Sequence, residues 1–312
     1  MEKRSIGTLS VSLVGLGCNN FGIRLDQART TRVVEAALAA GIDFFDTADI
    51  YGGTKSEELV GKALGPRRRS VFVATKFGIP IDDQLEGGAR PEYIRRAVQA
   101  SLKRLGTDYI DLYQLHRPDP DVPIADTLGA LGELVTQGLV REIGCSNFSV
   151  ALLREAAAAL SPGQARFVSV QNEYSLLARE PERGVLATTA ELGAGFLPYF
   201  PLASGLLSGK YAKGRPAPEN TRLSAPDSPL RARFLSDDRV ARAEALRAFA
   251  EARGHSLLEL AFAWLKTRKP VASIIAGATS EEQVRANTAA VEWNLTPEEL
   301  SEVDRLAPLA AE

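Results

Sequence analysis

Short runs of apolar residues recur along the chain, and after each one apolar residues return with the period of a helix. A run of six to eight mostly apolar residues is typical of a strand buried on both faces, and a helical stretch after each run indicates repeated βα units around a parallel sheet. Eight runs fit this description: SLVGLG (12–17), IDFFDTA (42–48), SVFVATK (70–76), YIDLYQLH (109–116), REIGCS (141–146), FVSVQNE (167–173), GFLPYF (195–200) and ASIIAGAT (272–279).

The stretches between these runs carry the signals that begin and end helices. The segment 28–41 ends at Gly41, and the segment 90–106 begins with Pro91 in its first turn and ends at Gly106. Proline suits the first helical turn, and glycine readily adopts the left-handed conformation that closes a helix. Eight βα units in 312 residues fit a closed (β/α)8 barrel better than an open doubly wound sheet, so we predict a single barrel domain over 1–312.

Three further segments extend this plan. Residues 4–12 (RSIGTLSVS) alternate like a short β-hairpin, which we expect to close the floor of the barrel. The segments 78–90 and 214–238 are longer than ordinary connections, and they follow the third and seventh predicted strands. Because both follow the carboxyl end of a strand, we expect them on the barrel face where active sites form.

Composition narrows the function classes. A net charge of −2 and a pI near 5.9 provide no basic surface for nucleic acid. No apolar segment approaches the length that spans a bilayer, and the N-terminus lacks the apolar stretch of a signal peptide. The two cysteines, Cys18 and Cys145, end apolar runs, where a buried free thiol is the ordinary state. We therefore expect a cytoplasmic protein without nucleic-acid or membrane partners, without a metal site, and monomeric or homo-oligomeric.

Four chemically able side chains lie at or just beyond the carboxyl ends of three consecutive strands. The second strand leads to Asp46 and Tyr51, the third ends at Lys76 and the fourth ends at His116. Taken singly, each has a structural explanation: a polar strand end, a loop aromatic, a helix cap or a surface charge. Together they predict one shared site, because neighbouring strand ends open into the same barrel mouth.

Lys76 lies within apolar residues in VATKFG (73–78). A buried ammonium needs a carboxylate partner or it loses its proton, and Asp46 on the neighbouring strand can be that partner. A cation beside the hydroxyl of Tyr51 favours the phenolate, so we expect Lys76 to lower the pKa of Tyr51 and make it a usable proton donor.

Several spaced motifs resemble those of the aldo-keto reductase superfamily, over nearly the whole chain. They are FDTADIYG (45–52), VATKFG (73–78), DLYQLHRP (111–118), GCSNF (144–148), QNEYS (171–175), YFPLASGLLSGKY (199–211) and IAGATSEEQVRAN (275–287). The resemblance implies a catalytic tetrad of Asp46, Tyr51, Lys76 and His116, with Tyr51 as the general acid in hydride transfer between nicotinamide and a carbonyl carbon. His116 would orient the carbonyl oxygen as a neutral hydrogen-bond donor.

The resemblance also implies a nicotinamide cofactor. Its carboxamide would be bound by Ser146, Asn147 and Gln171, and its ring would stack on Tyr199. The other positions that match cofactor-binding positions of the family are Pro201, Leu202, Ser204, Leu206 and Lys210 for the pyrophosphate, and Gly277, Thr279, Gln283 and Asn287 for the adenosine.

The adenosine end departs from many relatives. Gly277, Thr279 and Gln283 stand where those relatives carry a lysine or an arginine, which weakens recognition of a 2′-phosphate. The long loop offers Arg222, Arg231 and Arg233 as substitutes. We expect NADP, the habit of the family, with NAD as the alternative.

For the substrate, an aldehyde or ketone or the corresponding alcohol, we expect a pocket of Asn20, Phe21 and Phe77. Two other functions remain possible from the sequence: a cofactor-binding regulatory subunit resembling potassium-channel β-subunits, and a barrel isomerase or hydrolase. The isomerase or hydrolase is disfavoured, because neither a metal-binding cluster nor a Gly-x-Ser-x-Gly elbow is present in the sequence.

Overall fold

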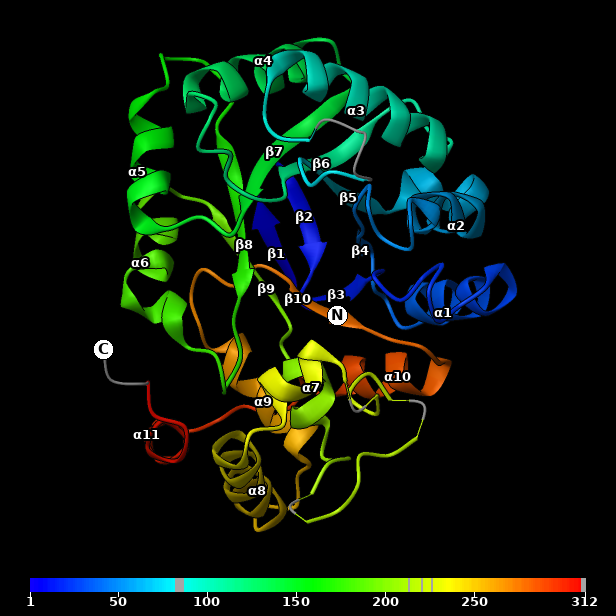
Figure 1. Cartoon of the computed structure of the whole chain (residues 1–312). Coiled ribbons are helices and arrows are strands. Elements are labelled where there is room, and N and C mark those ends of the chain that lie inside the picture. The colour runs from blue at the N-terminus through cyan, green and yellow to red at the C-terminus, as the bar shows by residue number, and fades with distance from the viewer. Residues whose placement is uncertain (82–86, 213, 220, 226, 310–312) are drawn as a thin grey trace.

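The computed structural model describes residues 1–81, 87–212, 214–219, 221–225 and 227–309 (Figure 1). Within them, eight parallel strands are hydrogen-bonded in the order β10-β3-β4-β5-β6-β7-β8-β9. Their bounds are β3 (Val14–Gly17), β4 (Phe44–Asp46), β5 (Phe72–Phe77), β6 (Ile110–Leu115), β7 (Val140–Ser146), β8 (Phe167–Glu173), β9 (Gly195–Tyr199) and β10 (Ile274–Gly277). Each strand falls within one of the eight apolar runs, except that β5 continues to Phe77 and β7 begins at Val140.

The sheet closes on itself between β9 and the segment that leads into β10. The backbone N–H of Phe196 donates to the carbonyl of Pro270, and the N–H of Ala272 donates to the carbonyl of Phe196 at 2.9 Å. With β10 paired to β3, these bonds complete the ring. The predicted (β/α)8 barrel is therefore confirmed.

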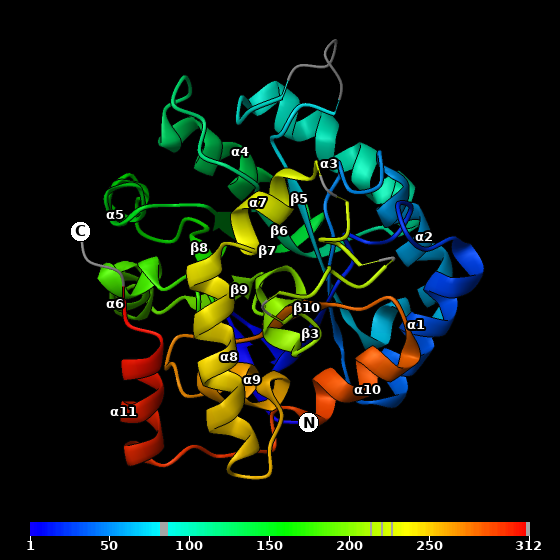
Figure 2. The same ribbon diagram turned by 60° about the horizontal axis from the view of Figure 1, so that its bottom comes forward.

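Helices surround the barrel and cover its outer face (Figure 2). Their bounds are α1 (Gln27–Ala39), α2 (Lys55–Leu64), α3 (Pro91–Leu105), α4 (Ile124–Thr136), α5 (Val150–Ala158), α6 (Val185–Glu191), α7 (Pro229–Phe234), α8 (Asp237–Glu251), α9 (Leu257–Lys266), α10 (Glu281–Ala289) and α11 (Pro297–Leu306). Pro91 begins α3, and Gly106 ends it with φ at 63°, as the sequence predicts. Among the helices of the described residues, none has the length and apolar character that a membrane span needs.

The N-terminal hairpin fills one end of the barrel. Strands β1 (Lys3–Ile6) and β2 (Leu9–Ser12) pair in antiparallel fashion and lie across the ring in Figure 1. They contribute Ile6, Leu9 and Val11 to an apolar cluster with side chains from inside the barrel. Because this end is packed with apolar groups, chemistry is confined to the opposite end, where the strands have their carboxyl termini.

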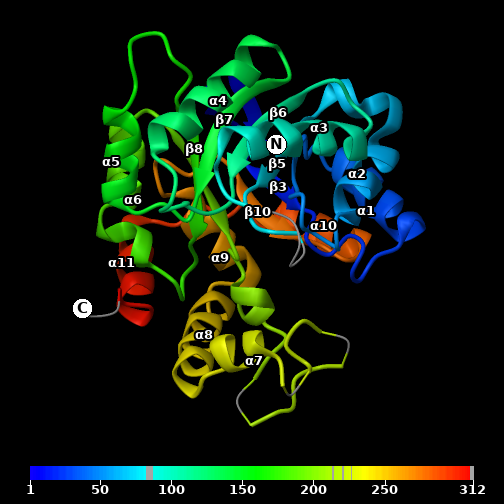
Figure 3. The same ribbon diagram turned by 45° about the horizontal axis from the view of Figure 1, so that its top comes forward.

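Two long segments lie at the carboxyl ends of the strands, as expected. Residues 82–86 of the first lie outside the described residues, as do 213, 220 and 226 in the region of the second. The segment between β9 and α8 contains a 3-10 turn over Ala203–Ser208 and the short helix α7. Figure 3 shows α7, its loop and α8 standing off the barrel on one side.

Candidate active site

A cavity of about 610 Å³ opens at the carboxyl ends of the strands. Its size suits a bound organic molecule. It is lined by most of the site residues that the sequence predicted: Asn20, Asp46, Tyr51, His116, Ser146, Asn147, Gln171, Tyr199, Pro201, Leu202, Ser204, Lys210, Gly277, Thr279, Gln283 and Asn287. Lys76 lies beneath this surface, fully buried and bonded to two of the lining residues.

The buried cation at the base of the cavity is held by three oxygens. The ammonium nitrogen of Lys76 is 2.7 Å from Asp46 Oδ2, 2.8 Å from the carbonyl of Thr47 and 3.4 Å from the hydroxyl of Tyr51. Asp46 is the last residue of β4 and Lys76 the second-last residue of the neighbouring β5, and both side chains are directed into the barrel. The predicted ion pair is therefore present, and it places a positive charge beside the Tyr51 hydroxyl.

The loop that carries Tyr51 is shaped by Gly52. This glycine adopts φ of 63°, and a Cβ there would lie 2.4 Å from the carbonyl oxygen of Phe21. A residue with a side chain would force the loop away from the end of β3. Glycine after tyrosine thus lets the loop approach closely enough to put Tyr51 above Lys76.

The electrostatics of Tyr51 correct one prediction. Burial raises the pKa of the Tyr51 hydroxyl, Lys76 opposes this rise, and Asp46 adds to it, so the pKa lies above the ordinary value. The sequence reasoning included the cation but not the depth of burial, which is the larger effect. The same surroundings act on Lys76: burial lowers its pKa, but Asp46 and Tyr51 outweigh burial and leave the pKa raised.

His116 lies beside Tyr51 as a neutral ring. The centroids of the two rings are 5.9 Å apart in an edge-on arrangement. Burial, Lys76 and Arg117 lower the pKa of the imidazole to about 3. His116 Nδ1 is buried and has no hydrogen-bond partner among the described residues. A neutral imidazole therefore lines the same cavity as Tyr51.

A chain of hydrogen bonds connects the ion pair to the other wall. Gln171 Nε2 donates to Asp46 Oδ1 at 2.9 Å, and Ser146 Oγ donates to the carbonyl of Gln171 at 2.7 Å. Asn147 Nδ2 donates to the carbonyl of His116 at 2.9 Å, and Asn147 Oδ1 accepts from the hydroxyl of Tyr199 at 2.8 Å. These bonds fix amide groups beside the aromatic face of Tyr199 at the base of the cavity.

Strained backbone forms the next part of the wall. Ala203 and Ser204 have φ of 46° and 56°, and Gly205 follows with φ of 99°. The N–H groups of Ala203 and Gly205 donate to the carbonyls of Phe200 and Leu202, and backbone strain of this kind clusters at ligand sites. Ser204 Oγ is buried without a partner among the described residues, and Lys210 lines the same wall. This wall is suited to a phosphate.

Comparisons with known proteins agree with this geometry. The family model described as "Aldo/keto reductase family" matches residues 13–308. The chain belongs to the aldo/keto reductase family. It is therefore an NAD(P)H-dependent oxidoreductase with the (β/α)8 fold of that family.

Two curated relatives cover nearly the whole chain. A "Probable aldo-keto reductase 1" of Glycine max is 35% identical over 320 residues, which are 99% of this chain and 90% of the relative. A "Probable voltage-gated potassium channel subunit beta" of Oryza sativa subsp. japonica is 33% identical over 315 residues, covering 97% of this chain and 96% of the relative.

Solved structures of family members superpose over the full chain. The holo form of the aldo-keto reductase AKR11C1 from Bacillus halodurans gives a TM-score of 0.82 at 35% identity, covering 100% of this chain and 98% of that one. The glycerol dehydrogenase AKR11B4 from Gluconobacter oxydans gives a TM-score of 0.84 at 29% identity with the same coverage.

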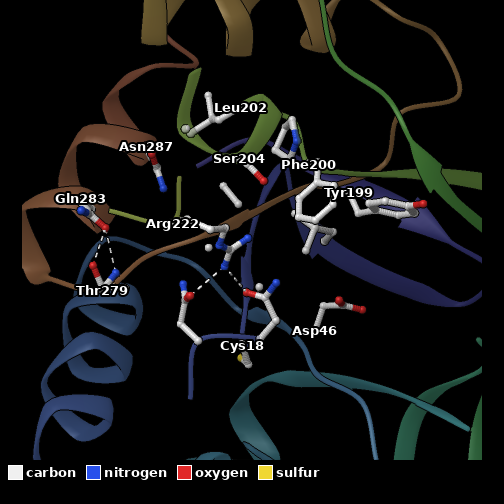
Figure 4. Close-up of a pocket in the computed structure, with 18 of the residues that line it drawn as sticks. Cys18, Asp46, Tyr199, Phe200, Leu202, Ser204, Arg222, Thr279, Gln283 and Asn287 are labelled. Carbon is white, nitrogen blue, oxygen red and sulfur yellow. Dashed lines mark hydrogen bonds between the residues drawn. The ribbon is translucent and has the colours of Figure 1, made fainter. Parts of the chain in front are cut away.

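The groups that line the cavity are of the kinds that a nicotinamide cofactor binds: an aromatic ring, side-chain amides and a cation. Tyr199 and the amides of Asn147 and Gln171 lie at the end of Asp46 and His116, and the strained Ser204 segment follows. At the far end, Gln283 Oε1 accepts from the Thr279 N–H at 2.8 Å, beside Asn287 (Figure 4). The far end is polar but uncharged.

A cation that reaches across the cavity comes from the long loop. Arg222 Nη2 donates to Asn19 Oδ1 at 3.0 Å and to Asn20 Oδ1 at 2.7 Å, and its guanidinium lies over the ring of Phe200. Figure 4 shows Arg222 between the wall of Ser204 and Phe200 and the wall of Cys18. Burial and the nearby Arg24 lower the pKa of Arg222.

The other two candidate arginines of the loop differ from Arg222. Arg233 lines the cavity and is ion-paired with Glu173, whereas Arg231 does not line it and donates to the carbonyl of Leu223. Of the three, Arg222 is the one that lines the cavity without a carboxylate partner among the described residues.

Three predicted contacts need correction. Phe21, Phe77 and Leu206 are fully buried and do not line the cavity. Phe77 follows the inward-facing Lys76 on β5, so its side chain points out of the barrel and stacks on Tyr113 at 4.7 Å. The alternation along the strand was the signal that excludes Phe77.

Sequence reasoning also missed part of the lining. Asn19, Arg24, Arg117 and Phe200 face the cavity. Asn19 and Phe200 adjoin predicted residues, and Arg117 follows His116, so proximity to the motifs was their available signal. Cys18 and Cys145 are buried free thiols, as predicted, and no group of three or more potential metal ligands occurs in the part of the chain that the structure describes.

Proposed function

We propose that this protein reduces the carbonyl group of aldehydes or ketones to alcohols, or catalyses the reverse oxidation, with Tyr51 as the proton donor. The observation that carries the proposal is the Lys76 ammonium, held 2.7 Å from Asp46 and 3.4 Å from the Tyr51 hydroxyl, with a neutral His116 beside them. A bound nicotinamide cofactor supplies or accepts the hydride.

Three side chains would donate the proton, stabilise the resulting charge and orient the carbonyl group. The raised pKa keeps Tyr51 protonated at neutral pH, so its hydroxyl can donate a hydrogen bond and then the proton to the carbonyl oxygen. The Lys76 ammonium stabilises the phenolate that Tyr51 leaves behind, because opposite charges attract strongly in a buried site. His116 donates a hydrogen bond to the same carbonyl oxygen and fixes its position.

We further propose NADP as the preferred cofactor, with NAD as the alternative. Lys210 and Arg222 lie on the cavity wall. Burial, and then the positive charge of Arg24, lower the pKa values of both side chains. Cations that destabilise one another in this way favour a phosphate between them. The uncharged contacts at Thr279 and Gln283 offer no cation to a 2′-phosphate, which keeps NAD as the alternative.

A second candidate function is a cofactor-binding regulatory subunit. The curated relative from rice named as a potassium-channel β-subunit favours it, since it is aligned over 97% of this chain. Both functions require the cofactor site, but the regulatory one does not require rapid turnover.

The experiment that tests the proposal combines binding with turnover. Purified protein is titrated with NADPH and NADH, followed by quenching of its intrinsic fluorescence, and then assayed with aldehydes and ketones. Tight binding and carbonyl-dependent cofactor oxidation support the reductase. Tight binding without turnover across the panel favours the regulatory subunit, and no binding of either cofactor contradicts both functions.

A further inference from the structure

A second group of titratable side chains lies directly behind the catalytic ion pair, on the outer face of the barrel. On β5, Lys76 points inward and Thr75 points outward, where Thr75 is the register partner of Tyr113 on β6. Thr75 Oγ1 donates to Glu57 Oε1 at 2.6 Å, and Arg104 Nε donates to Glu57 Oε2 at 2.6 Å. Both oxygens of the fully buried Glu57 are therefore bonded.

Asp49 belongs to this group, but the hydrogen bonds of the group do not include its carboxylate. Its side chain is only 1% exposed, and neither carboxylate oxygen has a hydrogen-bond partner among the described residues. The hydroxyl of Tyr113, also fully buried, lacks a partner as well. A buried carboxylate without a partner is strongly disfavoured in its charged form, so this enclosure favours the protonated acid.

The charges around Asp49 reinforce that preference. Burial and the negative charge of Glu57 raise the pKa of Asp49 to about 7. Arg104, the nearby Ile50 N–H, which does not reach hydrogen-bond geometry, and Lys76 oppose this rise. The negative charge of Asp49 also raises the pKa values of the phenols of Tyr93 on α3 and of Tyr113. Two carboxylates thus share one guanidinium, and Glu57 already binds it.

Asp49 is also tied to the loop that carries Tyr51. Its backbone N–H donates to the carbonyl of Lys76 at 3.1 Å. The N–H of Tyr51 donates to the carbonyl of Ala48 at 3.2 Å, and the N–H of Ser56 donates to the carbonyl of Tyr51 at 3.1 Å. Displacement of Asp49 would therefore move the backbone that sets the distance from Tyr51 to Lys76.

We propose that Asp49 is a positioning residue for Tyr51, which holds the loop in its active geometry while protonated and loosens it when ionised. The protonated acid carries no charge to repel Glu57, so it can keep its buried position. On ionisation the proton is transferred to solvent water, and the second negative charge beside Glu57 pushes the Asp49 segment outward. The inference rests on the proposed role of Tyr51 as proton donor.

The test compares pH profiles of carbonyl reduction at saturating cofactor. Wild-type kcat should fall by about tenfold between pH 6 and pH 9 with a midpoint near the pKa of Asp49, well below the pH at which Tyr51 itself ionises. Asp49→Asn, which imitates the protonated acid, should change by less than about twofold over this range. The control is Asp108→Asn, which removes a carboxylate that is 77% exposed and should keep the wild-type profile.

A second variant tests the direction in which the midpoint of the pH profile moves. Glu57→Gln removes the repelling charge and should move the midpoint to lower pH by about one unit. A purely structural role for the cluster would lower activity in both variants without removing the midpoint in one and shifting it in the other. Identical profiles for wild type and Asp49→Asn would overturn the inference.

A readout without turnover separates this inference from the proposed function. With ¹³C-labelled tyrosine, the Tyr51 signal, assigned by its loss in Tyr51→Phe, should shift near pH 7 in wild type and not in Asp49→Asn. That result supports the inference even if no substrate is turned over. A Tyr51 signal that is constant from pH 5 to pH 9 in both proteins overturns it, whatever the activity.

Discussion

The two ends of the cavity are built in different ways. At the end that we propose to be catalytic, Asp46, Lys76 and Gln171 lie on strands of the barrel and are joined by hydrogen bonds of 2.7 and 2.9 Å. At the other end, Arg222 comes from the long loop, Thr279 precedes α10 and Gln283 lies in the first turn of α10. The side chains of the first end are carried by strands that are paired on both sides, whereas Arg222 of the second end is carried by a loop. Chemistry should therefore be sensitive to single changes at the strand ends, and cofactor choice to changes in the loop.

The largest effect is expected at the buried ion pair. Lys76→Met leaves Asp46 charged and without its partner in a buried site, which should lower the free energy of unfolding by about 3 to 5 kcal/mol. It also removes the cation that stabilises the phenolate of Tyr51. Chemical denaturation measures the first effect and kcat of the folded fraction the second. An unchanged free energy of unfolding would show that the ion pair of Asp46 and Lys76 does not stabilise the fold as we describe.

The next largest effect is expected in how the free energy of unfolding depends on pH. The pKa of Asp49 is about 7 in the folded protein, above the ordinary value of 3.8, so the folded state binds the proton more tightly than the unfolded state. Stability should therefore fall as pH rises from about 4 to about 7, and stay low above that range. Relative to Asp49→Asn, wild type should lose up to roughly 4 kcal/mol across this interval. Parallel denaturation curves for the two proteins at pH 4 and pH 8 would contradict this.

A smaller effect is expected at the loop. Arg222→Leu removes the guanidinium from the cavity and should raise the Kd of the cofactor by about tenfold, with kcat at saturating cofactor changed by less than about threefold. Arg215→Leu is the matched control, because Arg215 belongs to the same loop, is exposed and does not line the cavity. Equal effects of the two substitutions would assign the change to overall charge rather than to the site.

The smallest effect is expected at the adenosine end. Gln283→Arg places a cation where the present contacts are polar and uncharged, and it should improve binding of NADPH relative to NADH by about fivefold. Parallel fluorescence titrations measure the ratio. A ratio that does not change would mean that the 2′-phosphate is recognised elsewhere in the cavity.

Much of this molecule could be predicted from its sequence, for a physical reason. Buried parallel strands must be apolar and their active ends must be polar, so the order of strands and the positions of Asp46, Lys76 and His116 follow from the pattern alone. The spaced motifs then narrow the chemistry to one family. Phe77 was misplaced although the alternation along β5 contains the answer.

Other features depend on depth and on long-range contacts that no local pattern records. The pKa of Tyr51 is raised because burial outweighs Lys76, and the sequence does not show how deeply the hydroxyl lies. The bond from Arg222 to Asn20 joins residues that are 202 positions apart. Asp49 lies between two motif residues, yet its isolation from partners appears only when α2, α3 and β6 enclose it.

The most direct test of the central claim is single-turnover reduction of an aldehyde by Tyr51→Phe with NADPH bound beforehand. Our account predicts that the hydride-transfer step slows by about 100-fold or more while the Kd of the cofactor stays within about twofold of wild type, because the ring remains and only the proton donor is lost. A variant that reduces the aldehyde at the wild-type rate would contradict the assignment of Tyr51.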